Sequence, residues 1–344
     1  MFRVSNFTSF AAGTFIMPDE RGADALLLVV KGTFQAARGA VRLAKEQRKL
    51  IVADVYWGEP DVSSLKYASD IHLPKPATDV AMVGAAYAPA GRPVAEFPFS
   101  LAVGPLRRTI RVFGDRTVGA RGISAAAPMT RVPLIYERAY GGTLRLPNGG
   151  VQSEPRNPVG RGFRARQPRR GPAGEAMPTL LPNLVEMREL GDDSTETLAP
   201  VGVGYVAPSW EPRLTRGGTY GPRWLEERSP FLPEDFDPRF LQAASPGLVA
   251  QGRLRGGEPV EIVNGAPHPD SVLRFSLPCV ELQAKVRIGA REETCPLQVD
   301  TVLFEPDDDA LFAMTWMASL PCHNRAPRID WVTFGASRIE GVVD

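Results

Sequence analysis

Apolar residues in the first 130 positions occur in short runs or alternate with other residues, and no window shows a convincing helical period. The run at 25–30 is continuously apolar and predicts a buried strand that leads into a turn at 31–34. The segments 97–103 and 109–114 alternate at a period of two, and 80–87 is a further apolar run. Glycine-rich or proline-rich breaks separate these runs, a pattern typical of an all-β domain.

The chain from about residue 179 onward shows the same kind of pattern. Asn264 and Gly265 directly follow a short apolar run and predict a hairpin with a two-residue turn. Asp237 and Pro238 predict the start of one short helix, with Asp237 as its cap and Phe240 facing inward. The predicted strands of this region are 260–263, 272–277, 280–282, 285–288, 297–304 and 311–316.

A basic segment at 147–182 separates the two strand-rich regions. It holds little apolar content and, beside prolines and glycines, the arginines Arg161, Arg164, Arg166, Arg169 and Arg170. We interpret it as a long surface loop, which either contacts an acidic partner or is a solvated linker. The chain of 344 residues is long enough for two cores. We therefore expect a mainly β protein, α+β at most, with sandwich-like or barrel-like lobes at 1–146 and 183–344.

Composition adds limits on partners and location. The 33 glycines and 33 prolines favour short strands and long ordered loops. With 40 basic and 39 acidic residues the net charge is +1, and nothing in it calls for a nucleic acid or a membrane as partner. Three cysteines without a CxxC motif fit reduced thiols, and no secretory signal or apolar stretch of bilayer length is found. We expect a cytoplasmic protein.

Catalytic and metal-binding signatures are not persuasive in this sequence. His72, His268 and His323 lie far apart, and the adjacent Cys322 and His323 do not have metal-ligand spacing. Phosphate-binding glycine motifs and a GxSxG motif do not occur. The acidic run at 307–309 lacks the alternating oxygens of a calcium loop. We therefore expect no enzymatic activity, no cofactor and no metal site.

One enzymatic alternative stays open at this point. Pairs of acids, such as Asp54 with Asp70 or Glu234 with Asp235, are the side chains that a glycan hydrolase uses. The sequence does not give the distance between the two carboxylates of either pair. A carbohydrate-binding β-module is a third interpretation.

Clusters of aromatic and polar residues are the most distinctive feature of the chain. Aromatic and arginine side chains dominate protein interfaces, so these clusters indicate a partner-binding surface. The structural interpretation is that Lys75 and Asp79 lock a loop, that Glu137 pairs with Arg138, and that Gly141 sits in a tight turn with positive φ. The candidate partner-binding residues are Tyr136, Glu137, Arg138, Tyr140, Trp210, Arg213, Tyr220 and Trp224.

These clusters, in this order, resemble a bacterial family catalogued as a domain of unknown function. The resemblance spans roughly residues 1–320 and rests on a series of motifs. They are Val30-Lys-Gly-Thr-Phe34, Asp54, Tyr56, Lys75-Pro76, Thr78-Asp79-Val80, Gly114-Asp115-Arg116, Tyr136-Glu-Arg-Ala-Tyr-Gly-Gly142, Asn157-Pro158, Trp210, Pro212-Arg213, Gly218-Thr-Tyr220, Trp224 and Leu232-Pro-Glu-Asp-Phe-Asp237.

The resemblance implies a role in type VI secretion. Genes of that family lie beside genes for VgrG spike proteins and toxin effectors, and its members are thought to bind an effector in the cytoplasm and help to load it onto the spike. The expected partners are therefore a toxin effector and VgrG. Two departures stand out: Gly221 follows Tyr220 where the family often has Asp, and the pentapeptide repeats of some members are missing.

Overall fold

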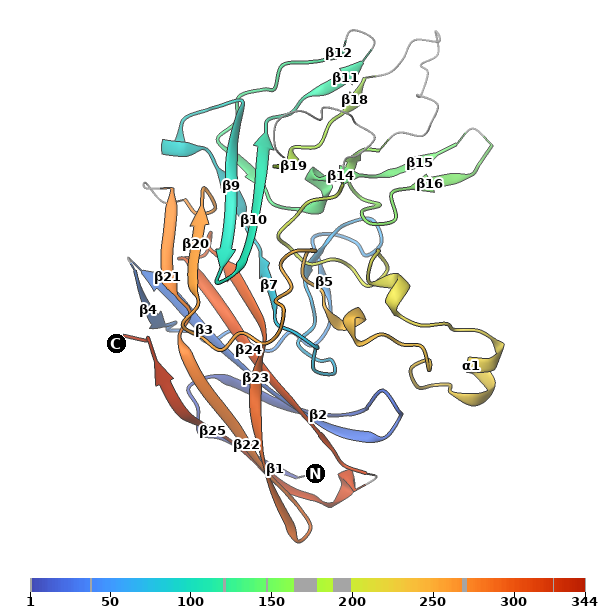
Figure 1. The fold of residues 1–344 in the computed structure, drawn as a ribbon, viewed down its shortest axis with the longest axis vertical. Coiled ribbons are helices and arrows are strands. Elements are labelled where there is room, and N and C mark those ends of the chain that lie inside the picture. Colours follow the sequence, from blue (N-terminus) through green and yellow to red (C-terminus); the bar gives the residue numbers. More distant parts are fainter. Residues whose placement is uncertain are drawn as a thin grey trace.

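The computed structural model describes residues 2–37, 39–119, 122–146, 148–163, 178–187, 199–267, 271–323 and 325–343. Its largest element is a nine-stranded, strongly curled sheet with the strand order β1-β25-β22-β23-β24-β3-β2, in which β4 also pairs with β3 and β7 with β23 (Figure 1). The pairs β1–β25 and β7–β23 are parallel and the others antiparallel. The strands are β1 Arg3–Asn6, β2 Ala11–Pro18, β3 Asp24–Ala37, β4 Ala40–Leu43, β7 Asp79–Met82, β22 Cys279–Ile288, β23 Arg291–Glu305, β24 Leu311–Pro321 and β25 Ile329–Glu340.

A second, antiparallel sheet has five strands in the order β19-β10-β9-β20-β21. Its strands are β9 Glu96–Val103, β10 Leu106–Phe113, β19 Leu184–Glu186, β20 Pro259–Val263 and β21 Val272–Ser276. The smaller pairings join β5 Val55–Tyr56 to β6 Leu65–Tyr67, β8 Ala85–Tyr87 to β13 Arg131–Pro133, β14 Tyr140–Gly141 to β17 Arg161–Gly162, β15 Thr143–Arg145 to β16 Val151–Ser153, and β11 Thr117–Gly119 to both β12 Gly122–Ile123 and β18 Thr179–Leu180.

Helical structure is short in the described part of the chain. The α-helix α1 spans Pro222–Glu227, and 3₁₀ turns lie at Pro89–Gly91, Tyr136–Arg138, Leu214–Arg216, Pro238–Leu241 and Ala326–Arg328. Within the described ranges, no helix is long and apolar enough to cross a membrane.

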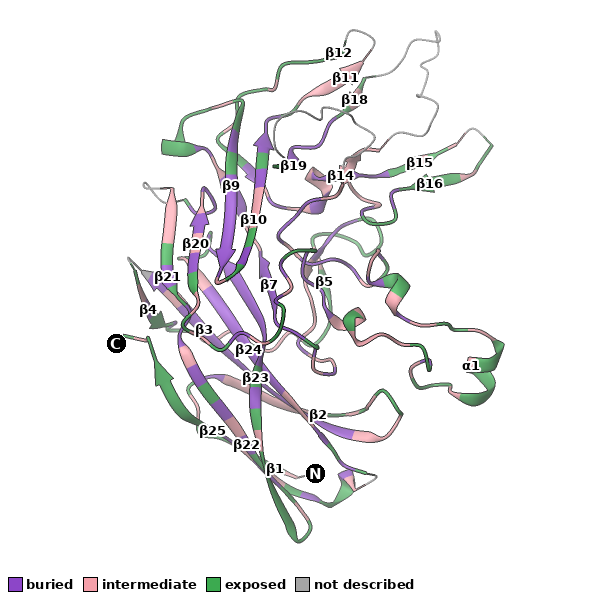
Figure 2. Ribbon diagram, in the orientation of Figure 1, coloured by how far each residue is buried: buried purple, intermediate pink, exposed green. Residues whose placement is uncertain are grey.

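One large apolar core joins the two sheets, and Figure 2 shows the buried positions along their strands. Phe34, Phe312 and Trp316 are fully buried side chains of the nine-stranded sheet, and Phe99 and Ile110 are fully buried in the five-stranded sheet. Phe275 of β21 lies with its ring centroid 5.0 Å from that of Phe312. The alternation that the sequence shows at these strands therefore builds the interior between the sheets.

The prediction of a mainly β protein is confirmed, with corrections to individual segments. The strand predicted at 25–30 does not turn at 31–34 but continues to Ala37, and its residues 31–35 stay paired with β24. Asn264 has a positive φ of 56° and its N–H donates to Ser271 O, so the predicted hairpin exists. Its connection runs from 264 to 271, however, and the predicted two-residue turn is wrong.

The short helix predicted at Pro238 is present as a 3₁₀ turn. Its cap is Asp237, whose carboxylate accepts a hydrogen bond from the Arg239 N–H, and Phe240 is half-buried. The strands predicted at 280–282 and 285–288 are one continuous strand, β22.

The pairing of strands crosses the expected boundary between lobes. In the nine-stranded sheet β3 pairs with β24, and in the five-stranded sheet β9 pairs with β20. Each sheet thus combines strands from 1–146 with strands from 183–344. Of the basic segment, Arg161 lies in β17, whereas Arg164, Arg166, Arg169 and Arg170 fall outside the described residues.

Candidate functional site

An arm formed by residues 211–240 carries four exposed large apolar side chains. Figure 1 shows it projecting from the two sheets, with α1 near its end. Tyr220 packs edge-on against Trp224, at 4.8 Å between ring centroids. The exposed apolar side chains of the arm are Leu214 (56% exposed), Tyr220 (58%), Leu225 (65%) and Phe231 (37%).

Hydrogen bonds hold the arm in one conformation. The Asp235 carboxylate accepts from the Thr219 N–H at 2.9 Å and from the Thr219 hydroxyl at 2.7 Å. The Trp224 indole N–H donates to Phe231 O at 2.7 Å. The exposed side chains are therefore presented by an ordered element, which lowers the entropy cost of binding a partner.

The arm is also attached to the hairpin between β2 and β3. The Arg228 guanidinium donates to Glu20 O at 2.9 Å. The Phe231 ring covers Gly22, where φ is +83° and a Cβ would lie 2.7 Å from ring atoms. These contacts place the arm against the turn that connects the outer strand β2 to β3.

Trp210 and Arg213 occupy the base of the arm and are buried. Trp210 is 2% exposed and packs edge-on against Tyr136, with 5.5 Å between ring centroids. The Arg213 guanidinium donates to Phe240 O at 2.9 Å and to Val206 O at 2.7 Å. These two side chains therefore hold the arm to the core, and a partner does not reach them in this structure.

The side chains of Tyr136, Glu137 and Arg138 also make their main contacts within the chain, where they stabilise the fold. Tyr136 is buried, which raises the pKa of its phenol to about 12. The Glu137 carboxylate accepts from the Ser64 N–H at 2.7 Å and from the Ser64 hydroxyl at 2.6 Å. Arg138 pairs with Asp115 at 3.1 Å. Glu137 and Arg138 thus have separate partners, and the expected pair between them is not formed.

Tyr140 is half-buried and begins the turn that the sequence predicted. Gly141 and Gly142 have φ of +146° and +123°, which confirms the positive φ. A Cβ on Gly141 would lie 2.1 Å from Asn157 O, so only glycine fits there. Of the eight candidate residues, the structure leaves Tyr220 well exposed and Trp224 half-exposed on the arm.

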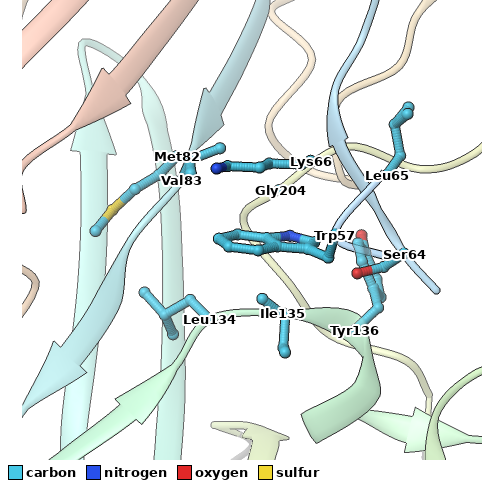
Figure 3. A pocket seen from close by; sticks show the side chains of 10 residues that line it. All are labelled: Trp57, Ser64, Leu65, Lys66, Met82, Val83, Leu134, Ile135, Tyr136 and Gly204. Atoms are coloured by element: carbon cyan, nitrogen blue, oxygen red, sulfur yellow. The ribbon is translucent and has the colours of Figure 1, made fainter. Parts of the chain in front are cut away.

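A small hollow lies next to this segment (Figure 3). Its lining includes Trp57, Lys66, Met82 and Tyr136, and the Lys66 ammonium lies 4.7 Å from the centroid of the Trp57 ring. The cavity volume is about 10 Å³, which is the space of about one water molecule. The hollow is too small for a sugar or a nucleotide.

A buried ionic cluster joins four charged side chains between β7 and β23. The Lys75 ammonium lies 2.9 Å from Asp79 and 3.2 Å from Asp300, and Arg253 lies 3.3 Å from Asp300. The two cations balance the two carboxylates. Lys75 is 3% exposed, and Asp79 and Asp300 are fully buried, so the cluster is closed to a ligand.

The pKa shifts in this cluster follow from its charges. Although burial alone lowers the pKa of Lys75, Asp300 and Asp79 raise it above its usual value. Burial alone raises the pKa of Asp300, but Lys75, His72 and Arg253 hold it well below its usual value. The expected lock between Lys75 and Asp79 is therefore present, and Asp300 is a third member that the sequence reasoning missed.

The acids considered for a glycan hydrolase have structural partners. Asp70 is buried and lies 2.8 Å from the Lys31 ammonium, and Asp54 accepts a hydrogen bond from the Ser69 N–H. Asp235 binds Thr219, while Glu234 lies 3.6 Å from Arg223. Among the described carboxylates, each one with a clear pKa shift is shifted downward, opposite to the shift of a general acid.

The acidic run at 307–309 and Cys322, which were the other candidates for chemistry, also have structural surroundings. Asp307 pairs with Arg131, and Asp308 pairs with Arg48. Burial raises the pKa of the Cys322 thiol, which keeps it protonated. Within the described ranges, no group of three or more His, Cys, Asp and Glu side chains is placed to hold a metal ion. His268 lies outside those ranges.

Comparison with known proteins gives one match. The model of a family described as "Uncharacterized protein conserved in bacteria (DUF2169)" matches residues 21–317. No curated protein and no solved structure matches the chain.

Proposed function

The chain belongs to the bacterial family DUF2169, and on that premise we propose that it is an adaptor of type VI secretion, which binds a toxin effector in the cytoplasm and helps to load it onto the VgrG spike. The effector is held as a folded or partly folded polypeptide, through contacts between side chains. The chain acts on it by binding and orientation rather than by a chemical step.

The observation that carries the proposal is the ordered arm with its exposed apolar side chains. Tyr220 and Leu225 are 58% and 65% exposed although the arm around them is fixed by internal hydrogen bonds. Large apolar side chains gathered on a projecting, ordered element are typical of a surface that a protein partner covers.

The electrostatics of the interior support binding over catalysis. The Lys75 cluster is closed, and its two cations and two carboxylates neutralise each other. The carboxylates that show a clear pKa shift are held in the ionised form. Such groups stabilise the fold and are poorly suited to proton transfer near neutral pH.

The test is retention of a candidate toxin effector, which the proposal expects to be encoded by a neighbouring gene. The two proteins are coexpressed, the chain is purified through a tag, and the retained toxin is quantified per mole of chain. We expect stoichiometric retention by the wild type. Leu225→Asp places a charge in the proposed interface and Tyr220→Ala removes a ring, so each lowers the affinity about tenfold or more.

A matched control comes from another exposed apolar side chain. Val151 is 62% exposed and lies in β16, which Figure 1 shows well apart from α1, and Val151→Asp should retain the toxin fully. Adding purified VgrG should give a ternary complex only when the chain is present. Failure of the wild type to retain the toxin, or equal retention by all three variants, contradicts the proposal.

A further inference from the structure

The strand β2 is an edge of the nine-stranded sheet and carries no charged residue. It spans Ala11–Pro18, with the sequence AAGTFIMP, and pairs with β3 alone. Proteins protect exposed edges with charges, short strands or bulges, because an unpaired edge binds further strands. Proline also protects an edge, and β2 has one proline, Pro18, at its last position.

The alternation of an antiparallel ladder shows which backbone groups of β2 face outward. The Asp19 N–H donates to Ala23 O at the hairpin end, so odd-numbered residues of β2 bond to β3. The N–H and C=O groups of Ala12, Thr14 and Ile16 therefore point away from β3. In the described part of the chain, no hydrogen bond is recorded for these groups.

Other sheet edges are protected differently. The edge strand β1 has four residues and includes Arg3. The part of β25 that extends beyond its pairing with β1 ends with Arg338 and Glu340, which pair with each other. On the edge strand β21, Arg274 pairs with Glu261 of the neighbouring strand. Compared with the edge strands β1 and β21, which have four and five residues, the eight-residue β2 is both longer and uncharged.

We propose that the outer edge of β2 binds an extended, uncharged segment of the effector as an added strand of the sheet. This inference rests on the proposed function and names the chemistry of the bound segment. The outward N–H and C=O groups require a strand-like backbone as partner. The lack of charge in β2, and the 48% exposed Ile16, fit a segment of apolar and hydroxyl side chains.

The closeness of β2 to the arm supports an effector segment as the bound strand. Arg228 and Phe231 tie the arm to the hairpin that ends β2. A polypeptide that lies along β2 thus reaches the exposed side chains of the arm, and the two surfaces form one continuous binding region. A second copy of the chain is the competing occupant, and the test distinguishes it.

The probe is a fluorescein-labelled octapeptide of alternating valine and threonine, and fluorescence polarisation measures its binding to the full chain. We expect saturable binding by the wild type. Thr14→Pro removes an outward N–H while the ladder to β3 keeps its bonds, and it should weaken binding about tenfold or more. Thr14→Val keeps the N–H and should bind like the wild type. A peptide with proline at alternate positions should not bind.

A second measurement covers the case in which Thr14→Pro does not fold. Hydrogen exchange of the wild type, with and without the octapeptide, should show slower exchange at Thr14 and Ile16. Absence of saturable binding, or unchanged exchange at these amides, overturns the proposal. So does a wild-type dimer in light scattering that Thr14→Pro dissociates, because a second copy then occupies the edge. The octapeptide assay contains no toxin, so its failure is separate from failure of the retention test.

Discussion

Lys75 shows at the scale of a residue how a polar motif of the sequence becomes part of the interior. Its ammonium contacts Asp79 four residues later and Asp300 on a distant strand, and its Nζ also donates to the Thr301 hydroxyl at 2.7 Å. The ammonium is thus paired with two carboxylates and hydrogen-bonded, which lowers the cost of burying its charge.

Lys75→Met is expected to lower the free energy of unfolding by about 3–5 kcal/mol, because two buried carboxylates lose a cation. Lys66→Met is the control, since Lys66 is half-buried over Trp57 and its removal should cost about 1 kcal/mol or less. Urea unfolding followed by circular dichroism measures both. A loss below about 1 kcal/mol for Lys75→Met would show that the cluster does not hold the fold.

His72 gives a prediction for pH dependence. Burial lowers the pKa of its imidazole, although Asp300 lies 3.6 Å away. The unfolded chain therefore takes up a proton below about pH 6.5 while the folded chain does not. The free energy of unfolding should therefore decrease as the pH is lowered through this range, by at most about 1.4 kcal/mol per pH unit.

The measurement is urea unfolding at several values between pH 7.5 and 5. His72→Gln cannot bind this proton and should show a smaller slope than the wild type. The exposed His323→Gln is the matched control and should keep the wild-type slope. Equal slopes for the wild type and His72→Gln would contradict the assignment.

At the scale of an element, the arm and its base carry two tryptophans with different roles. Trp210 packs on Tyr136 in the core, while Trp224 packs on the exposed Tyr220 near the end of the arm. A side chain in the core contributes to stability through close packing, whereas one at an exposed surface is free to contribute to binding.

Trp210→Ala should therefore lower the free energy of unfolding by about 3–5 kcal/mol. Trp224→Ala should lower it by about 1 kcal/mol or less and should reduce toxin retention instead. Urea unfolding and the retention assay together measure the contrast. Similar losses of stability for both variants would place Trp224 among the structural residues.

At the scale of the whole molecule, strands that are far apart in the sequence share both sheets. The long strand β3 pairs along β24, and β7 pairs with β23, so the first and last parts of the chain complete each other. One core lies between the two sheets. Folding of either part alone would expose the apolar face of its strands to water.

We therefore expect unfolding in a single cooperative transition. Circular dichroism and tryptophan fluorescence should give coincident urea curves, because Trp316 and the strands around it belong to the same core. Residues 1–146 expressed alone should lack a cooperative transition. Two separated transitions, or a folded 1–146 fragment, would show that the lobes are independent.

The sequence by itself determined the class of fold and the position of many strands. The segments 97–103 and 109–114 are strands β9 and β10, since alternation at a period of two is a local property of the chain. The cap at Asp237 and the glycine turn at Gly141 were also readable, because they depend on neighbouring residues.

Only the tertiary structure decided which strands pair and which polar or aromatic side chains are buried. Asp300 joins Lys75 from a strand more than two hundred residues away, and no local pattern marks that contact. Trp210 and Trp224 both lie in proline-rich and charged surroundings, yet one is core and the other lies on the arm. Burial depends on what the rest of the chain places against a side chain, and that information is not local.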